Sequence, residues 1–144
     1  MPPTGPIDEF LREAEGLPGV DAETVARVEE ALGITFPPDY RELVTTMDGA
    51  DGPVGGDDGG WIVFLPVRDL ARETQEMLVG DDGNDLVLSA TNGGSEGFAF
   101  VHSGGVVDRI ITVPLYPFER GEALEPGQNV EELLRTLGAG LGAG

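Results

Sequence analysis

Cysteine and lysine are absent from this sequence, and histidine and tryptophan occur once each. Without cysteine the chain has no thiol nucleophile, no thiolate metal ligand and no disulfide, so it does not depend on an oxidising compartment. Without lysine a Walker-type phosphate loop is excluded. No stretch approaches the roughly 18 apolar residues of a membrane span, and the N-terminal residues lack the basic and apolar parts of a secretory signal. The expected location is the cytoplasm.

Positive charge is also scarce. Eight arginines stand against 27 aspartates and glutamates, which gives a formal net charge of -19. Nucleic acid and anionic membranes are therefore unexpected partners, because both are bound through basic side chains. A basic protein would be attracted, and its association would be accelerated at low salt. Selection for solubility explains such a charge equally well, and the sequence leaves both explanations open.

Three amphipathic helices are predicted in the first third of the chain. The first follows Pro6, the second starts after Asp21 as its N-cap and closes at Gly33, and the third is primed by Pro37 and Pro38. The third helix has apolar residues at i, i+3, i+4 and i+7, which are Tyr40, Leu43, Val44 and Met47.

The segment 48–60, DGADGPVGGDDGG, is rich in glycine and aspartate, and we expect an exposed, mobile loop there, with Gly49 ending the third helix. Asp69 is expected to cap a short helix and Asn129 a last one. The prolines of 114–128 favour irregular structure. Strands are predicted at 61–65, 86–90, 97–102 and 106–113.

This order of elements predicts an α+β fold, with N-terminal helices packed on one face of a mostly antiparallel sheet and a closing C-terminal helix. Residues 1–20 are interpreted as an N-terminal helix and linker, 21–138 as a single domain and 139–144 as a flexible tail. Strands such as GFAFV are apolar on both faces. Either the rest of the chain or a partner is therefore expected to cover the second face.

The stretch LGITFPPDYRELVTTMDGADG, residues 32–52, resembles the SUKH superfamily, whose members include fungal cell-wall assembly regulators and many bacterial immunity proteins. The resemblance continues through Trp61, which opens a strand, the glycine-flanked strands of 91–105 and the helical NVEELLRTL of 129–137. It covers the chain from about residue 22 onward. It implies an α+β domain that acts by binding proteins, either as an immunity protein or as a regulatory scaffold.

Catalysis and cofactor binding find little support. His102 can be imagined with Ser95 or Ser103 in nucleophilic catalysis, but neither serine lies in a G-x-S-x-G elbow and nothing specifies an oxyanion hole. The carboxylates of 48–58 suggest calcium, but the ligand alternation fails and Gly59 stands where a bidentate glutamate is needed. We therefore predict no catalytic residue, no metal and no cofactor.

The predicted partner-binding residues lie in and beside the acidic segment. Trp61 is interpreted either as a core residue or as an interface anchor next to these carboxylates. The function predicted is a non-enzymatic immunity protein that occludes the active site of a basic, nuclease-like toxin; the alternative is a general regulatory module of the cell-wall assembly regulator type. The residues expected to contact the partner are Asp48, Asp51, Asp57, Asp58 and Trp61.

Overall fold

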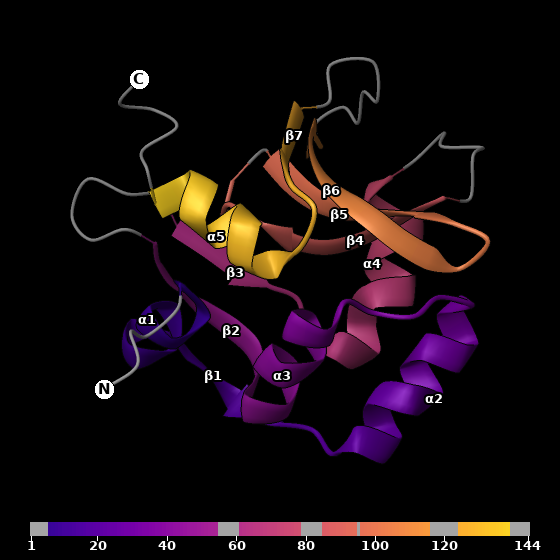
Figure 1. Ribbon diagram of the computed structural model, residues 1–144, viewed down its shortest axis with the longest axis horizontal. Coiled ribbons are helices and arrows are strands. Elements are labelled where there is room, and N and C mark those ends of the chain that lie inside the picture. The colour runs from indigo at the N-terminus through magenta and orange to yellow at the C-terminus, as the bar shows by residue number, and fades with distance from the viewer. Residues whose placement is uncertain (1–5, 55–60, 79–84, 95, 116–123, 139–144) are drawn as a thin grey trace.

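The computed structural model describes residues 6–54, 61–78, 85–94, 96–115 and 124–138. Helices and strands are mixed along the chain (Figure 1). The helices are α1 (Pro6–Glu13), α2 (Ala22–Leu32), α3 (Pro38–Thr46), the 3-10 helix η2 (Val67–Asp69), α4 (Leu70–Met77) and α5 (Val130–Gly138). The strands are β1 (Glu15–Pro18), β2 (Met47–Pro53), β3 (Trp61–Phe64), β4 (Leu86–Thr91), β5 (Glu96–Ser103), β6 (Val106–Pro114) and β7 (Leu124–Gly127).

The strands form one seven-stranded sheet in the order of the sequence, β1-β2-β3-β4-β5-β6-β7, and every neighbouring pair is antiparallel. The longest pairing joins β5 and β6 around the turn at Gly104 and Gly105, which both have positive φ. The two edge strands, β1 and β7, have four residues each, and each contains a proline. The predicted α+β class with an antiparallel sheet is confirmed.

Helices α1, α2, α3 and α5 bury their apolar residues against one face of the sheet. Its centre is aromatic: the Tyr40 ring lies 4.8 Å from Phe36 and 5.0 Å from Phe100, both edge-to-face. Tyr40, Leu43 and Val44 are fully buried, so the predicted apolar face of the third helix is the face that enters the core.

The opposite face of the sheet carries a second apolar cluster. Its members from β4, β5 and β6 are buried, and they pack with Leu78, Leu115 and the partly buried Met77 and Leu65. Helix α4 lies against β4, and the Thr74 hydroxyl accepts the Leu88 N–H at 2.9 Å. The chain itself therefore covers the second face of its central strands. Of the two possibilities left open by the sequence, the rest of the chain or a partner, the structure shows the first.

The predicted helix boundaries hold where side chains cap them. Asp21 accepts the Thr24 N–H at 2.8 Å and starts α2, while Gly33 closes it with φ 72°. At α5, Asn129 accepts the Glu132 N–H at 2.9 Å. These local signals are sufficient because each cap is made within a few residues.

The prediction for the start of the acidic segment is wrong. Helix α3 ends at Thr46, and 47–53 is strand β2, hydrogen-bonded to β1 on one side and β3 on the other. Glycine and aspartate disfavour strands, but pairing on both sides overrides that preference. The glycines permit close approach, since a Cβ at Gly52 would lie 2.8 Å from Ala14 Cα.

Two more strands escaped prediction. β1 lies within residues 1–20, which were interpreted as a helix and linker, and β7 lies in the stretch expected to be irregular because of its prolines. Both are edge strands, which tolerate proline because one side of the backbone needs no ladder partner. The predicted loop 55–60 and the predicted tail 139–144 lie outside the described residues.

Candidate protein-binding surface

Strand β2 places its acidic residues on opposite sides. Burial alternates along it, so Asp48, Ala50 and Gly52 point inward while Asp51 is partly exposed. From the sequence, Asp48 and Asp51 were predicted to lie together on an exposed loop. The structure separates them because neighbouring positions of a strand alternate between its faces.

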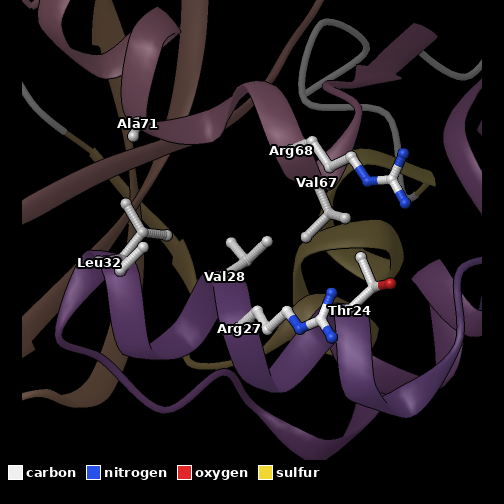
Figure 2. A pocket seen from close by; sticks show the side chains of 8 residues that line it. Thr24, Arg27, Val28, Leu32, Val67, Arg68 and Ala71 are labelled. Carbon is white, nitrogen blue, oxygen red and sulfur yellow. The ribbon is translucent and has the colours of Figure 1, made fainter.

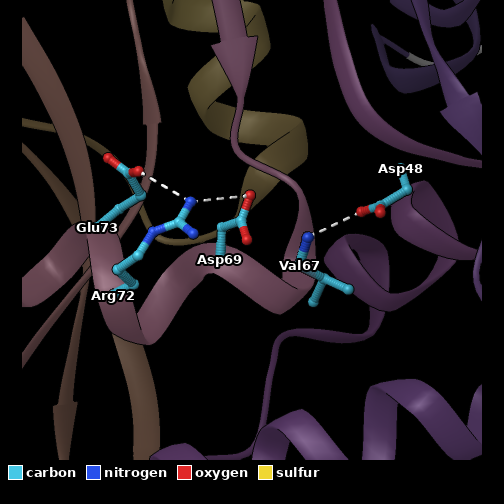
Figure 3. A network of polar contacts seen from close by, with 5 residues as sticks. All are labelled: Asp48, Val67, Asp69, Arg72 and Glu73. Atoms are coloured by element: carbon cyan, nitrogen blue, oxygen red, sulfur yellow. Dashed lines mark hydrogen bonds and ion pairs between the residues drawn. The ribbon is translucent and has the colours of Figure 1, made fainter.

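Asp48 is buried, with 5% of its surface exposed, and its Oδ1 accepts the backbone N–H of Val67 at 2.8 Å (Figure 3). That N–H is at the first residue of η2, where a helix start leaves donors without intrahelical partners. Asp48 thus joins β2 to the start of η2 and α4. Its carboxylate is engaged inside the fold, and we therefore exclude it from the surface that a partner can contact.

Charged residues that solvent can reach follow along η2 and α4. Arg72 lies 3.4 Å from a carboxylate oxygen of Asp69 and 3.4 Å from one of Glu73 (Figure 3). These pairs are solvent-accessible, so they contribute little to stability. In this region the Asp48 carboxylate is buried, whereas Asp69 and Glu73 are partly exposed and pair with the exposed Arg72.

Asp51 and Trp61 form a pair on the partly exposed side of β2 and β3. Trp61 lies opposite Pro53 in the β2–β3 register, half of its surface is exposed, and its Nε1–H donates to Oδ1 of Asp51. The core interpretation of Trp61 does not describe this position. The indole is instead held at the surface by Asp51, which lies two positions from Pro53 along the neighbouring strand.

We call the group formed by Glu15, Asp51, Pro53, Trp61 and Val63 the Trp61 surface. Glu15 lies directly opposite Asp51 in the β1–β2 pairing, and Val63 lies opposite it in the β2–β3 pairing. Two carboxylates in a directly opposed pair repel each other, so an external cation near them would relieve that repulsion. Asp57 and Asp58 lie outside the described residues.

Glu15 was missing from the sequence-based set because its strand was not predicted. A strand of four residues, EGLP, gives no alternation long enough to recognise. The glycine at position 93 also lies beneath this surface: a Cβ there would be 4.0 Å from Trp61 Cδ1 and 3.8 Å from Val63 Cγ2.

The catalytic alternative gains nothing from the geometry. His102 is partly buried on β5, opposite Val107, and its buried Nδ1 has no hydrogen-bond partner in the described ranges. A catalytic histidine is normally oriented by a hydrogen bond to this nitrogen. Within the part of the chain that the structure describes, no three His, Cys, Asp or Glu side chains are grouped to hold a metal ion.

None of the helices within the described ranges is both long enough and apolar enough to cross a bilayer. No curated protein matches this sequence closely enough to serve as a named relative. The sequence profile of the SMI1 / KNR4 family (SUKH-1) matches residues 19–136, which reach from just before α2 into α5 and include every residue of the Trp61 surface except Glu15. That match spans most of the chain and agrees with the resemblance seen in the residues themselves, so this protein belongs to the SMI1 / KNR4 (SUKH-1) family.

Proposed function

We propose that this protein is a non-catalytic immunity protein of the cytoplasm, which neutralises a basic, nuclease-like toxin by covering the toxin's active site. The family supports a role in protein interaction or immunity. The observation that carries the finer proposal is the half-exposed Trp61, held by Asp51 in a chain of net charge -19. A large aromatic side chain fixed among carboxylates suits a partner that presents arginine or lysine.

Two physical effects would act together at this surface. Carboxylates attract a cationic partner over several ångströms and favour rapid, correctly oriented encounter. The indole then supplies apolar contact area and a π face for a cation, and tryptophan is enriched among residues whose loss costs an interface about 2 kcal/mol or more. A nuclease is cationic where it holds phosphate, so the same complementarity would direct the protein to the active site.

Asp57 and Asp58 belong to the proposal as further carboxylates next to Trp61 in the sequence. Asp48 does not, because its carboxylate is buried and bonded to Val67. The Asp51→Asn change is informative here: asparagine keeps an oxygen that can accept the Trp61 N–H and removes only the charge.

The test begins with a tagged protein used to capture partners from its native host at about 50 mM and about 200 mM salt, because salt screens exposed charge pairs. The captured partner is then purified, and its nuclease activity is measured with and without one equivalent of this protein. We expect one basic partner, inhibited at 1:1, whose binding falls about 30-fold with Trp61→Ala. An Asp51→Asn, Asp57→Asn, Asp58→Asn variant should bind less tightly and lose most of the salt dependence.

Asp108→Asn is the matched control, because Asp108 is an exposed carboxylate on β6. It removes one charge away from the Trp61 surface and should leave affinity unchanged. If Asp108→Asn weakens binding as much as Asp51→Asn, only net charge matters and the Trp61 surface is not the contact. Recovery of several partners, none of them inhibited, would favour the regulatory alternative.

A further inference from the structure

A groove of about 340 Å³ lies between α2 and the η2–α4 segment (Figure 2). Its floor is mainly apolar, with Val67 buried and Val28 and Leu32 partly buried. Its rim is exposed and comprises Arg27, Ala31, Arg68 and Ala71, with Thr24 at one end. This volume is at the lower end of the range for ligand pockets, which begins at about 300 Å³.

The two ends of the groove differ in chemistry. The guanidinium groups of Arg27 and Arg68 lie at the end that holds Thr24, whereas Leu32 and Ala71 lie at the opposite end (Figure 2). A ligand that fills the groove must therefore be apolar along its length and anionic at one tip. Guanidinium groups recognise carboxylates as well as phosphates, because their planar N–H donors match two oxygens at once.

Two arginines at one groove end are unusual in this chain, which has eight in total against 27 carboxylates. Arg41, Arg72, Arg109 and Arg135 each lie within ion-pair distance of a carboxylate. Arg68 is exposed and makes no ion pair with any residue in the described ranges. Arg27 contacts Glu23 through one guanidinium nitrogen and keeps other N–H donors.

The carboxylate of Asp21 lies near the cationic end of the groove, and its pKa responds to the charges there. Hydrogen bonding from Thr24 lowers the pKa of Asp21, and the charges of Arg27 and Arg68 lower it further. Both arginines therefore lie close enough to the start of α2 for their charges to act on Asp21. Asp21 itself caps the helix by accepting the Thr24 N–H, so it is occupied in a structural bond.

We infer that this groove binds the C-terminal end of a partner protein chain, with the α-carboxylate between Arg27 and Arg68 and apolar side chains along the partly buried Val28 and Leu32. From Thr24 to Leu32 the helix rises about 12 Å, which matches three or four extended residues. The exposed rim leaves one side open, as a segment continuing into a larger partner requires. A free small molecule would need a more enclosed site, since ligand pockets bury 70% or more of their ligands.

This inference is independent of the proposed immunity function. The Trp61 surface is acidic and belongs to β1, β2 and β3. The groove has a cationic end and belongs to α2, η2 and α4, on the other side of the view in Figure 1. Loss of toxin binding would leave the groove inference untouched, and the reverse also holds.

The test measures binding of four fluorescein-labelled hexapeptides to the full chain by fluorescence anisotropy. Each peptide is Gly-Ser-Gly followed by an apolar C-terminal tripeptide, which is Val-Ala-Val, Leu-Ala-Leu, Ile-Ala-Ile or Phe-Ala-Phe. Each peptide is used with a free C-terminal carboxylate and as the C-terminal amide. We expect at least one free peptide to bind, its amide to bind about tenfold or more weakly, and Arg68→Gln to weaken the free peptide about tenfold without affecting the amide. Ala71→Phe, which fills the apolar end, should weaken both forms.

Arg135→Gln is the control, because Arg135 is an exposed arginine on α5 that pairs with Glu131. It should leave peptide affinity unchanged, and thermal unfolding of every variant shows whether it is folded. The inference is overturned if no free peptide binds, if amide and free peptide bind equally, or if Arg135→Gln weakens binding as much as Arg68→Gln. If decanoate displaces the peptides at concentrations below the Kd of the peptides, the groove binds a free acyl carboxylate instead, and the inference is overturned.

Discussion

Replacing Asp48 by alanine tests whether the acidic segment begins as a buried strand. In the fold, the Asp48 carboxylate is 5% exposed and accepts the Val67 N–H at 2.8 Å at the start of η2. Asp48→Ala removes the acceptor and leaves that N–H without a partner. Val67 is itself fully buried, so replacement by solvent is obstructed.

The expected cost follows from that lost bond. A buried donor left without a partner costs about 1–3 kcal/mol, and bonds to charged groups lie in the upper part of the range for hydrogen bonds. Removal of the buried carboxylate also relieves some of its own desolvation, which acts in the opposite direction. We therefore expect Asp48→Ala to lower the free energy of unfolding by about 2 kcal/mol, and Tm by roughly 6–8 °C in a chain of this size.

The assay is urea unfolding followed by circular dichroism at 222 nm, with Asp48→Asn and Asp51→Asn beside Asp48→Ala. Asp48→Asn keeps an oxygen acceptor and should recover part of the loss. Asp51→Asn is the matched change on the exposed side of the same strand and should stay within about 0.5 kcal/mol of the parent. A parent-like stability for Asp48→Ala, with an unchanged m-value, would refute the buried strand and restore the solvated loop that the sequence suggested.

The Tyr40 hydroxyl is fully buried and has no hydrogen-bond partner among the residues that the structure describes. Tyr40→Phe should therefore raise the free energy of unfolding by about 1 kcal/mol in urea unfolding, and a decrease would reveal a hidden partner. Burial raises the pKa of Asp39, whose carboxylate accepts the Glu131 N–H at 2.9 Å. The native state therefore binds the carboxyl proton of Asp39 more tightly than the unfolded chain does. The stability that this proton contributes is present below pH 3.8 and is lost as pH rises through the folded pKa. The free energy of unfolding of Asp39→Asn, measured relative to that of the parent, should therefore increase between pH 3.5 and pH 7. A difference that stays constant over this range would contradict the reasoning. Trp61→Ala should fold and lose about 1–2 kcal/mol, less than the roughly 3–5 kcal/mol of a core tryptophan, in the same assay.

The helices could be predicted because each carries its own signals. The apolar spacing of Tyr40, Leu43 and Val44 specifies the buried face of α3, and Asp21 and Asn129 mark helix starts through bonds made within three residues. Such information is local, so it can be read without knowing what the helix packs against.

The strands with weak local signals could not be predicted. β2 contains Gly49 and Gly52, which disfavour strands, yet it is fixed by pairing with β1 on one side and β3 on the other, and β1 comes from a distant part of the chain. Its burial alternates among aspartate, alanine and glycine, which are too small or too polar to produce a visible apolar pattern. Tertiary pairing therefore decides this segment.

The candidate surface was anticipated in part. Trp61 and Asp51 were both singled out, but their hydrogen bond and the exposure of the indole depend on the β2–β3 register. Asp48 was grouped with Asp51 because they are three positions apart in one acidic stretch. The strand turns one carboxylate inward and the other outward, and no property of the stretch alone distinguishes them.

The two short edge strands restrict the ways in which any partner can bind. Partners of open sheets often add a strand to an edge and gain affinity from main-chain hydrogen bonds, independently of side-chain identity. Here both edges are four residues long and each includes a proline, which interrupts the row of donors that an added strand would need. Recognition must then depend on side chains, so partner choice can change by single substitutions while the sheet remains the same, and the same edges protect the protein from joining copies of itself into a continuous sheet.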